Sequence, residues 1–188
     1  MILLRKQKQK QKRPNLESIN RAGQRYLARL PARQWLIDME MTMNANTQPT
    51  ITVSTVSGNA RLLHLPAMFG SQNINGWPAY VYGEKMAYAI MGEYDHNYTG
   101  GMWTFAKTSN HGRFMYPKTA RKTIFMDNSL NGCQCDMSPQ AAGLVVSILA
   151  IGAVMAKTMD DSLMDNHDAL MEYVYEHKEK AALLQFLD

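Results

Sequence analysis

Residues 98–117, YTGGMWTFAKTSNHGRFMYP, contain the pattern that decides the fold around them. Apolar residues alternate along its first half, as in a strand, and this places Trp103 and Phe105 on one face. Residues 108–112 supply a turn, because Asn and Gly tolerate a positive φ. An aromatic segment then runs back and ends at a proline, which has no N–H to donate. The stretch therefore predicts a β-hairpin over residues 102–116.

Three glycines in the stretch have structural meaning. Gly100 and Gly101 would let the backbone bend as it enters the first strand, or let another group approach closely. Gly112 belongs to the turn. No catalytic group is evident in the hairpin, so its residues point to architecture and recognition.

The segments after and before the hairpin predict the other elements. Apolar residues at helical spacing indicate a helix over 80–94. Strands are expected near 122–126 and 133–137, and helices from about residue 160 to the C-terminus. These expectations make an α+β fold, in which the hairpin and the two later strands form one small antiparallel sheet. A buried central helix and the C-terminal helices pack against that sheet.

The central helix is expected over residues 139–157. A Ser-Pro pair at 138–139 is a strong helix start, with Ser as N-cap and Pro in the first position. Residues 141–156 are apolar on every face, but sixteen residues fall short of the roughly 20 that cross a bilayer. A core helix surrounded by neighbours is the better interpretation. Gly143 and Gly152 would let those neighbours come close.

Charge is strongly segregated along the chain. Residues 1–33 hold ten Lys/Arg and one acid, whereas residues 34–188 hold ten Lys/Arg and fifteen acids. We therefore expect a basic N-terminal arm over 1–43, a Thr/Ser-rich linker over 44–57 and a globular domain over 58–188.

The arm has two interpretations. As an amphipathic basic segment it would make a weak nucleic-acid contact through residues 5–33, with no membrane span. Alternatively it is an ordinary solvated face, or it precedes the true translation start at Met39, Met41 or Met43.

Cysteine and histidine placement argues against a metal or redox site. Cys133 and Cys135 are two residues apart and are expected to be free thiols in a reducing cytoplasm. His96 and His111 could be imagined beside them, but this spacing is not that of a zinc site. The chain also shows no nucleophile elbow and no phosphate-binding glycine loop. We expect a cytoplasmic binding protein without catalysis or a cofactor.

A series of short motifs carries a family resemblance. In order along the chain they are Arg61, Leu65-Pro66-Ala67-Met68-Phe69-Gly70, Gly83-Glu84, Tyr98-Thr99-Gly100-Gly101-Met102-Trp103-Thr104-Phe105, Ser109-Asn110-His111-Gly112, Met115-Tyr116-Pro117, Ser138-Pro139-Gln140-Ala141-Ala142-Gly143 and Asp188. In order and spacing the chain resembles the ArdB/KlcA family of plasmid-borne antirestriction proteins. Two positions depart from the family pattern: His111 stands where a glycine is usual, and Arg113 where an aromatic residue is usual.

The resemblance implies a function. Such a protein would inhibit the host type I restriction endonuclease complex and so protect plasmid or phage DNA. Residues 44–188 hold thirteen acids and ten Lys/Arg, too few to copy a duplex that carries one charge per ~1.7 Å of axis. We therefore expect a mechanism other than DNA mimicry. The alternative is a DNA-binding accessory protein of a mobile element, which acts through the basic arm.

The resemblance also selects candidate functional residues. Arg61, Glu84 and Trp103 are retained by the family pattern; a structural ion pair is the alternative role for the two charged residues, and core packing is the alternative for Trp103. Asn110, His111 and Arg113 lie in or beside the turn. If the turn is the contact surface, His111 and Arg113 would change the target preference.

Overall fold

A helix that is apolar on every face runs through the middle of the computed structural model, which describes residues 51–188. The basic arm predicted at 1–43, and the nucleic-acid contact predicted at 5–33, lie outside the described residues.

The helices and strands follow one another along the chain in an α+β arrangement, which confirms the predicted fold class. The helical elements are η1 (Gly58–Leu63), α3 (His64–Phe69), α4 (Ala79–Tyr94), α5 (Pro139–Thr158), η2 (Asp161–Leu163), α6 (Met164–Glu176) and α7 (Lys180–Leu187). The strands are β1 (Val53–Thr55), β2 (Asn73–Ile74), β3 (Trp77–Pro78), β4 (Trp103–Thr108), β5 (Arg113–Pro117), β6 (Ile124–Asn128) and β7 (Cys133–Met137).

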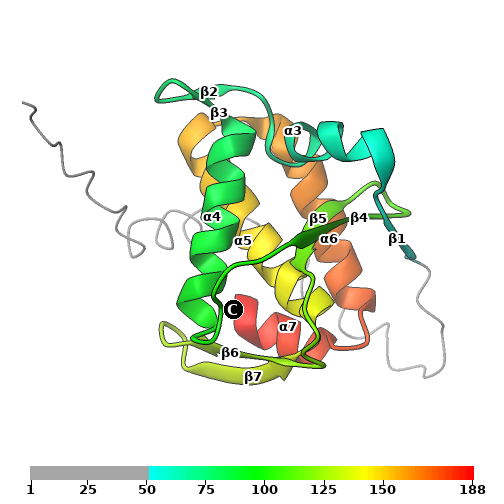
Figure 1. The fold of residues 1–188 in the computed structure, drawn as a ribbon, viewed down its shortest axis with the longest axis vertical. Coiled ribbons are helices and arrows are strands. Elements are labelled where there is room, and N and C mark those ends of the chain that lie inside the picture. The colour runs from blue at the N-terminus through cyan, green and yellow to red at the C-terminus, as the bar shows by residue number, and fades with distance from the viewer. Residues whose placement is uncertain (1–50) are drawn as a thin grey trace, which may run out of the picture.

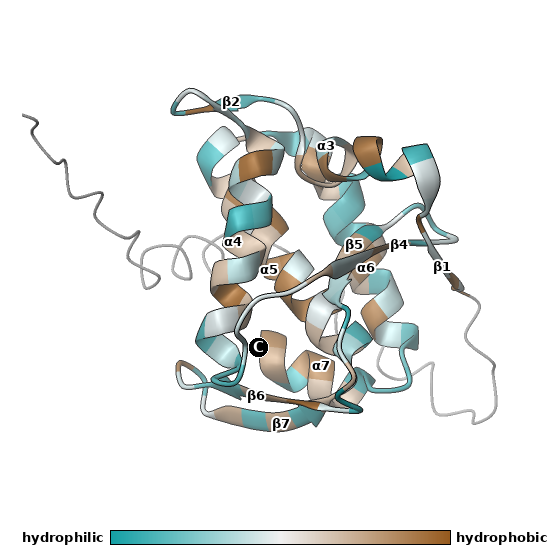
Figure 2. Ribbon diagram, in the orientation of Figure 1, coloured by the Kyte–Doolittle hydropathy of each residue, from teal (hydrophilic) through white to brown (hydrophobic). Residues whose placement is uncertain are grey.

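The central helix α5 forms as predicted. Ser138 caps it by accepting a hydrogen bond from the Ala141 N–H at 3.2 Å, and Pro139 occupies its first turn. Within residues 51–188, α5 is the one helix long and apolar enough to cross a membrane, but most of it is buried inside the protein. α4, the β5 strand and the C-terminal helices surround it (Figures 1 and 2).

The two glycines of α5 behave differently. A Cβ on Gly143 would lie 2.4 Å from the Cα of Tyr116, so only glycine allows this contact between α5 and β5. A Cβ on Gly152 would meet nothing within 4 Å. The prediction that Gly152 also permits close packing was therefore wrong.

The predicted hairpin is present, with β4 and β5 antiparallel over five residue pairs from Trp103↔Pro117 to Lys107↔Arg113. β1 adds a third strand on the other side of β4, which gives the order β1-β4-β5. Since β1 covers residues 53–55, the folded body begins before the boundary that we predicted at residue 58.

Side chains cover the free edge of β5. Ser147, the one polar residue in the apolar middle of α5, both accepts from the Met115 N–H and donates to the Met115 carbonyl, at 3.0 and 3.1 Å. Asn166 on α6 bonds both the N–H and the carbonyl of Arg113, at 2.6 and 3.3 Å. The edge is thus paired to helices, which protects it against pairing with another strand.

The strands β6 and β7 form a separate two-stranded sheet and do not extend the hairpin sheet. The prediction of one sheet was wrong in this respect. Alternating apolar residues predict strands, but they do not predict which strands pair with each other. Here α7 packs against β7. Asn128 and Asn131 also donate hydrogen bonds to the Phe186 carbonyl at the end of α7.

The sequence did not predict α3. Pro66 suggested an irregular segment, but it lies in the first turn of α3, where a missing N–H costs nothing. α3 then packs on α4 at Gly83, where a Cβ would come 2.4 Å from the Phe69 ring. In α6, Tyr173 is buried and Tyr175 is 43% exposed.

Candidate functional site

Two shallow hollows lie along the hairpin sheet, and four of the six candidate functional residues line them, whereas Glu84 and Asn110 do not. The first, which we call the Arg61 hollow, has a volume of about 150 Å³ and is lined by Val56, Arg61, Met102, Trp103, Thr104, Phe105 and Lys118. The second, the turn hollow, has a volume of about 290 Å³ and is lined by Thr52, Ser54, Lys107, Thr108, Ser109, His111 and Arg113.

Arg61 contacts an aromatic side chain. Its guanidinium carbon lies 5.3 Å from the ring centroid of Phe105, within the range of a cation–π interaction. The ring of His64 stacks on the same Phe105 at 5.0 Å. Among the salt bridges of residues 51–188, none joins Arg61 or Glu84 to a partner.

Trp103 is a core residue with one polar bond. Its side chain is 4% exposed, and its indole N–H donates to the Tyr98 hydroxyl at 2.9 Å. Its ring also packs against Tyr88 at 5.5 Å, and the Tyr88 hydroxyl donates to Glu84 at 2.8 Å. Burial and this bond to Glu84 raise the pKa of Tyr88. Glu84 therefore supports the packing of Trp103 through Tyr88.

Asn110 anchors the hairpin turn to helix α6. Its amide donates to the Ala169 carbonyl at 2.8 Å and to the Glu172 carboxylate at 2.9 Å, and its carbonyl oxygen accepts from the Thr108 hydroxyl. The two bonds to α6 span more than fifty residues of sequence. They give Asn110 an architectural role that the turn pattern alone did not show.

The backbone conformation of the turn explains why glycine is usual in the family pattern at the position that His111 occupies here. His111 has φ +72°, the left-handed region that glycine occupies without strain, and it is exposed. Gly112 packs tightly, since a Cβ there would come 2.9 Å from the Leu170 side chain. Gly100 and Gly101 have φ +94° and +134° with open space around them, so they shape the approach to β4 and contact nothing closely.

His64 is a buried histidine that the sequence did not single out. It is 1% exposed, and its Nε2 lies 3.1 Å from the Phe114 carbonyl, so Nε2 carries the proton. Its Nδ1 is buried without a hydrogen-bond partner. Desolvation is the main reason that its pKa falls from 6.5 to about 4, opposed by the Phe114 bond and assisted by the charge of Arg113.

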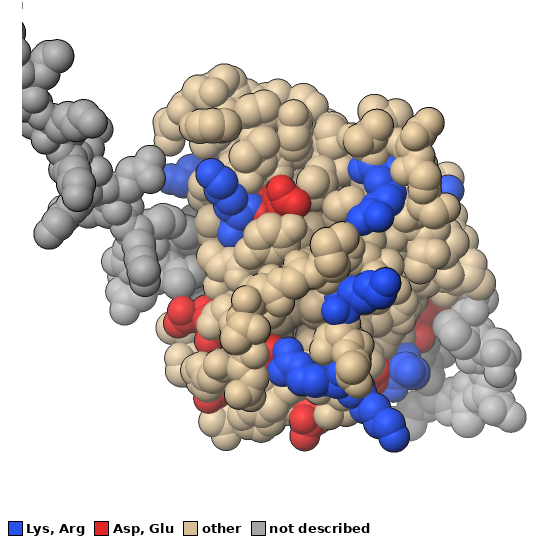
Figure 3. All heavy atoms as spheres, viewed as in Figure 1, with Lys and Arg blue, Asp and Glu red and all other residues tan. Residues whose placement is uncertain are grey.

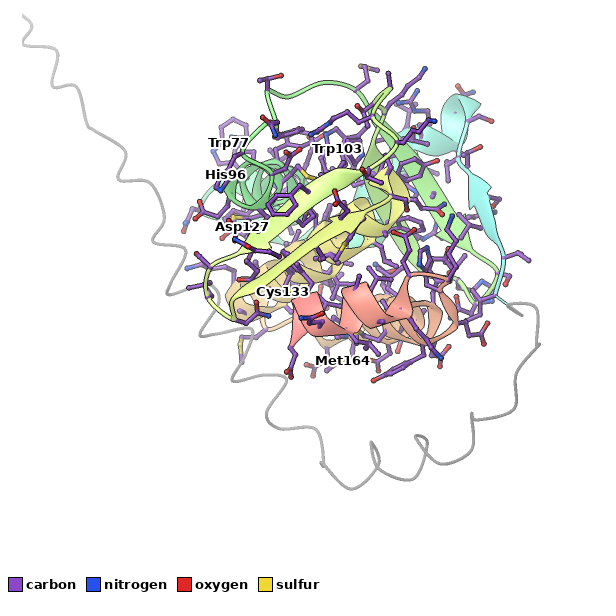
Figure 4. The ribbon with its side chains drawn as sticks, turned by 90° about the horizontal axis from the view of Figure 1, so that it is seen from below. Trp77, His96, Trp103, Asp127, Cys133 and Met164 are labelled. Atoms are coloured by element: carbon purple, nitrogen blue, oxygen red, sulfur yellow. The ribbon has the colours of Figure 1, made fainter. Side chains whose placement is uncertain are left out.

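The remaining titratable groups lie apart from the hollows. Arg121 forms a two-pronged salt bridge with the buried Asp95, and the Asp95 bond raises the pKa of Arg121. His96 and Asp127 lie 3.6 Å apart at an edge of the molecule (Figure 4).

The two cysteines face each other on β7. The sulfur atoms of Cys133 and Cys135 are 3.8 Å apart, and burial raises the pKa of Cys135 to about 12. Across residues 51–188, no three His, Cys, Asp or Glu side chains gather as a metal site would require. The lining of the two hollows offers cations, hydroxyls and aromatic edges, which suits binding.

Comparisons with known proteins agree with the motifs. A family model described as antirestriction protein matches residues 96–188. An antirestriction protein KlcA from Escherichia coli is 33% identical over 143 residues, which cover 73% of this chain and 94% of the relative. The uncharacterized protein YafX of Escherichia coli strain K12 is 32% identical over 139 residues, which cover 73% of this chain and 88% of YafX.

A solved structure has a similar fold. It comes from work on the KlcA and ArdB proteins, which describes a novel fold and antirestriction activity against type I DNA restriction systems in vivo but not in vitro. The TM-score is 0.64 at 31% identity, and the match covers 78% of this chain and all of the solved chain.

Proposed function

This chain belongs to the KlcA and ArdB family of antirestriction proteins, and we propose that it protects plasmid or phage DNA by inhibiting a host type I restriction enzyme in the cytoplasm. The observation that carries the proposal is the match to KlcA over nearly the whole length of that protein. The fold similarity to the solved structure supports the same assignment.

We propose a mechanism other than DNA mimicry, and the charge distribution supports it. Residues 51–122 carry seven Lys/Arg and three acids, whereas residues 123–188 carry three Lys and ten acids. On the face that Figure 3 shows, Lys and Arg groups are spread over the surface and Asp and Glu appear only as separate small groups. A duplex mimic needs a continuous acidic surface. Displacement of DNA from the purified enzyme by this protein, with steep salt dependence, would contradict our mechanism.

The solved relative supports an indirect mode of action. Activity in vivo but not in vitro is not what a tight competitive inhibitor of the purified enzyme would show. We propose that this chain likewise acts with a cellular component that a purified reaction lacks. On this view it is a binding protein and not an enzyme, and the hairpin sheet is the surface that meets its target.

A cellular assay separates this function from DNA binding through the basic arm. Unmodified plasmid is introduced into a type I-restricting host that expresses either the full chain or residues 44–188 only. We expect both forms to raise transformation efficiency, because the family model matches residues 96–188, which lie after the arm. Transformation of a host without the restriction system is the control. Loss of protection together with DNA affinity in the shortened form would favour the accessory-protein alternative.

A further inference from the structure

We propose that the turn hollow binds a phosphate group through Lys107 and Arg113. The proposal concerns a ligand site on the purified protein, so it stands or falls separately from the antirestriction function. Its basis is the lining of the hollow, which holds two cations and several hydroxyl groups on the three strands of the hairpin sheet and on the residues next to them.

Three residues of the hollow form one row across the sheet. Ser54 on β1 is the Cα partner of Lys107 on β4, and Lys107 is the partner of Arg113 on β5. Residues opposite one another in antiparallel strands project from the same face, a few ångströms apart. The row therefore places a hydroxyl, an ammonium and a guanidinium side by side on one face of the sheet.

Among residues 51–188, no carboxylate forms a salt bridge with either cation of this row, Lys107 or Arg113. Like charges directly opposite in a sheet destabilise it. The nearby α6 acids are engaged elsewhere: Glu172 accepts from the Asn110 amide, and Glu176 accepts from the Ile51 N–H at 2.8 Å. An anion in the hollow would relieve the repulsion between the two cations.

Hydroxyl groups complete the site. The Ser109 oxygen already accepts from the Thr52 N–H at 3.1 Å, so its own proton is available to a ligand. Ser54 and Thr52 also line the hollow and are exposed. A guanidinium donates two parallel bonds to a phosphate, and an ammonium adds a point charge. Hydroxyl donors beside these cations suit the several acceptor oxygens of a phosphate group.

The backbone around the hollow is held in place before any ligand arrives. Asn110 ties the turn to α6, and Asn166 of α6 accepts from the Arg113 N–H at 2.6 Å. His111, which has a positive φ, lines the hollow. Little ordering is then needed on binding, which favours affinity. Because His111 and Arg113 depart from the family pattern, we assign this site to the present chain.

The test is a titration of the full-length protein with inorganic phosphate at constant ionic strength, followed by amide NMR shifts. We expect saturable shifts at Ser54, Ser109 and Arg113. In Arg113→Gln and in Lys107→Gln the affinity should fall roughly tenfold or more, the usual loss for one charge-assisted bond. Lys178→Gln, an exposed lysine outside the hollow, is the matched control and should bind as the parent protein does.

Two further probes identify the source of the phosphate. A nucleoside monophosphate supplies a phosphomonoester, and a short single-stranded oligonucleotide without terminal phosphates supplies only backbone phosphodiesters. Arg113-dependent shifts with the first alone indicate a small-molecule ligand, and Arg113-dependent shifts with both indicate a nucleic-acid backbone; either result supports the site. No saturable shift with any probe, or equal shifts in Arg113→Gln and the parent protein, would overturn it.

Discussion

At the scale of single residues, the least expected feature is the buried imidazole of His64. The His64 ring stacks on the Phe105 ring, and the Arg61 guanidinium also lies over the Phe105 ring. A histidine and an arginine therefore share one aromatic ring. The neutral ring satisfies its one N–H on the Phe114 carbonyl. Protonation would place a second N–H at Nδ1, which has no partner and no access to water.

This burial makes the folded protein sensitive to acid. The folded pKa is about 4 and the unfolded value is 6.5, so the unfolded chain binds a proton more readily. The stability that neutral His64 gives the folded protein is fully present above pH 6.5 and is lost as the pH falls toward 4. At 1.36 kcal/mol per pKa unit, the loss amounts to about 3 kcal/mol. Urea unfolding of the parent protein at pH 7.5 and at pH 4.5 measures how far the free energy of unfolding falls between these two pH values.

Matched glutamine substitutions isolate the contribution of His64. In His64→Gln the fall in unfolding free energy between the two pH values should be smaller than in the parent protein. His111→Gln, which changes an exposed ring, should show the same fall as the parent protein. An equal fall in His64→Gln and the parent would contradict the assignment of the acid sensitivity to His64.

At the scale of elements, the contact between α5 and β5 positions the hairpin and both hollows. Gly143 brings the helix backbone against Tyr116, and Ser147 four residues later bonds the Met115 backbone. One face of α5 thus lets the helix backbone come close to β5 and also supplies hydrogen bonds to the unpaired backbone groups of that strand.

A pair of glycine substitutions on α5 tests this contact. Gly143→Ala puts a methyl group 2.2 Å from the Tyr116 Cβ, so we expect a loss of about 1–3 kcal/mol from overpacking. Gly152→Ala has open space and should gain up to about 1 kcal/mol from helix propensity. Thermal or urea unfolding distinguishes them. A Gly143→Ala protein as stable as Gly152→Ala would show that α5 and β5 do not meet as described.

The sequence predicted the elements whose patterns are local. The hairpin alternation, the Ser-Pro start of α5 and the helical spacing of α4 are each visible within a short window. Three features depend on distant partners and could not be read in this way: α3 behind Pro66, the separate β6–β7 sheet held by α7, and the different environments of Gly143 and Gly152.

In the candidate site, too, the sequence predicted the local features and missed those that depend on distant partners. Motifs brought Arg61, Trp103 and the turn to attention, and the structure places Arg61 and Trp103 in one hollow and His111 and Arg113 in the other. Lys107 opposite Arg113 became visible only through strand register. The alternation of a single strand shows which face a residue takes but not which residue faces it across the sheet.

At the scale of the whole molecule, charge and fold together define how the protein can act. Lys and Arg outnumber acids in residues 51–122, which include the hairpin, and acids outnumber Lys in residues 123–188, which include the C-terminal helices. Neither part resembles a uniformly acidic rod. A basic sheet with a rigid turn suits contact with an anionic surface, whether of an enzyme or of the nucleic acid that the enzyme holds.

The most direct measurement is the plating efficiency of unmodified phage on a type I-restricting host with and without this protein. We predict that expression raises plating efficiency on that host, and that it leaves the plating of modified phage, or of any phage on a non-restricting host, unchanged. Stable expression of the protein with no rise in the plating of unmodified phage would contradict the antirestriction function.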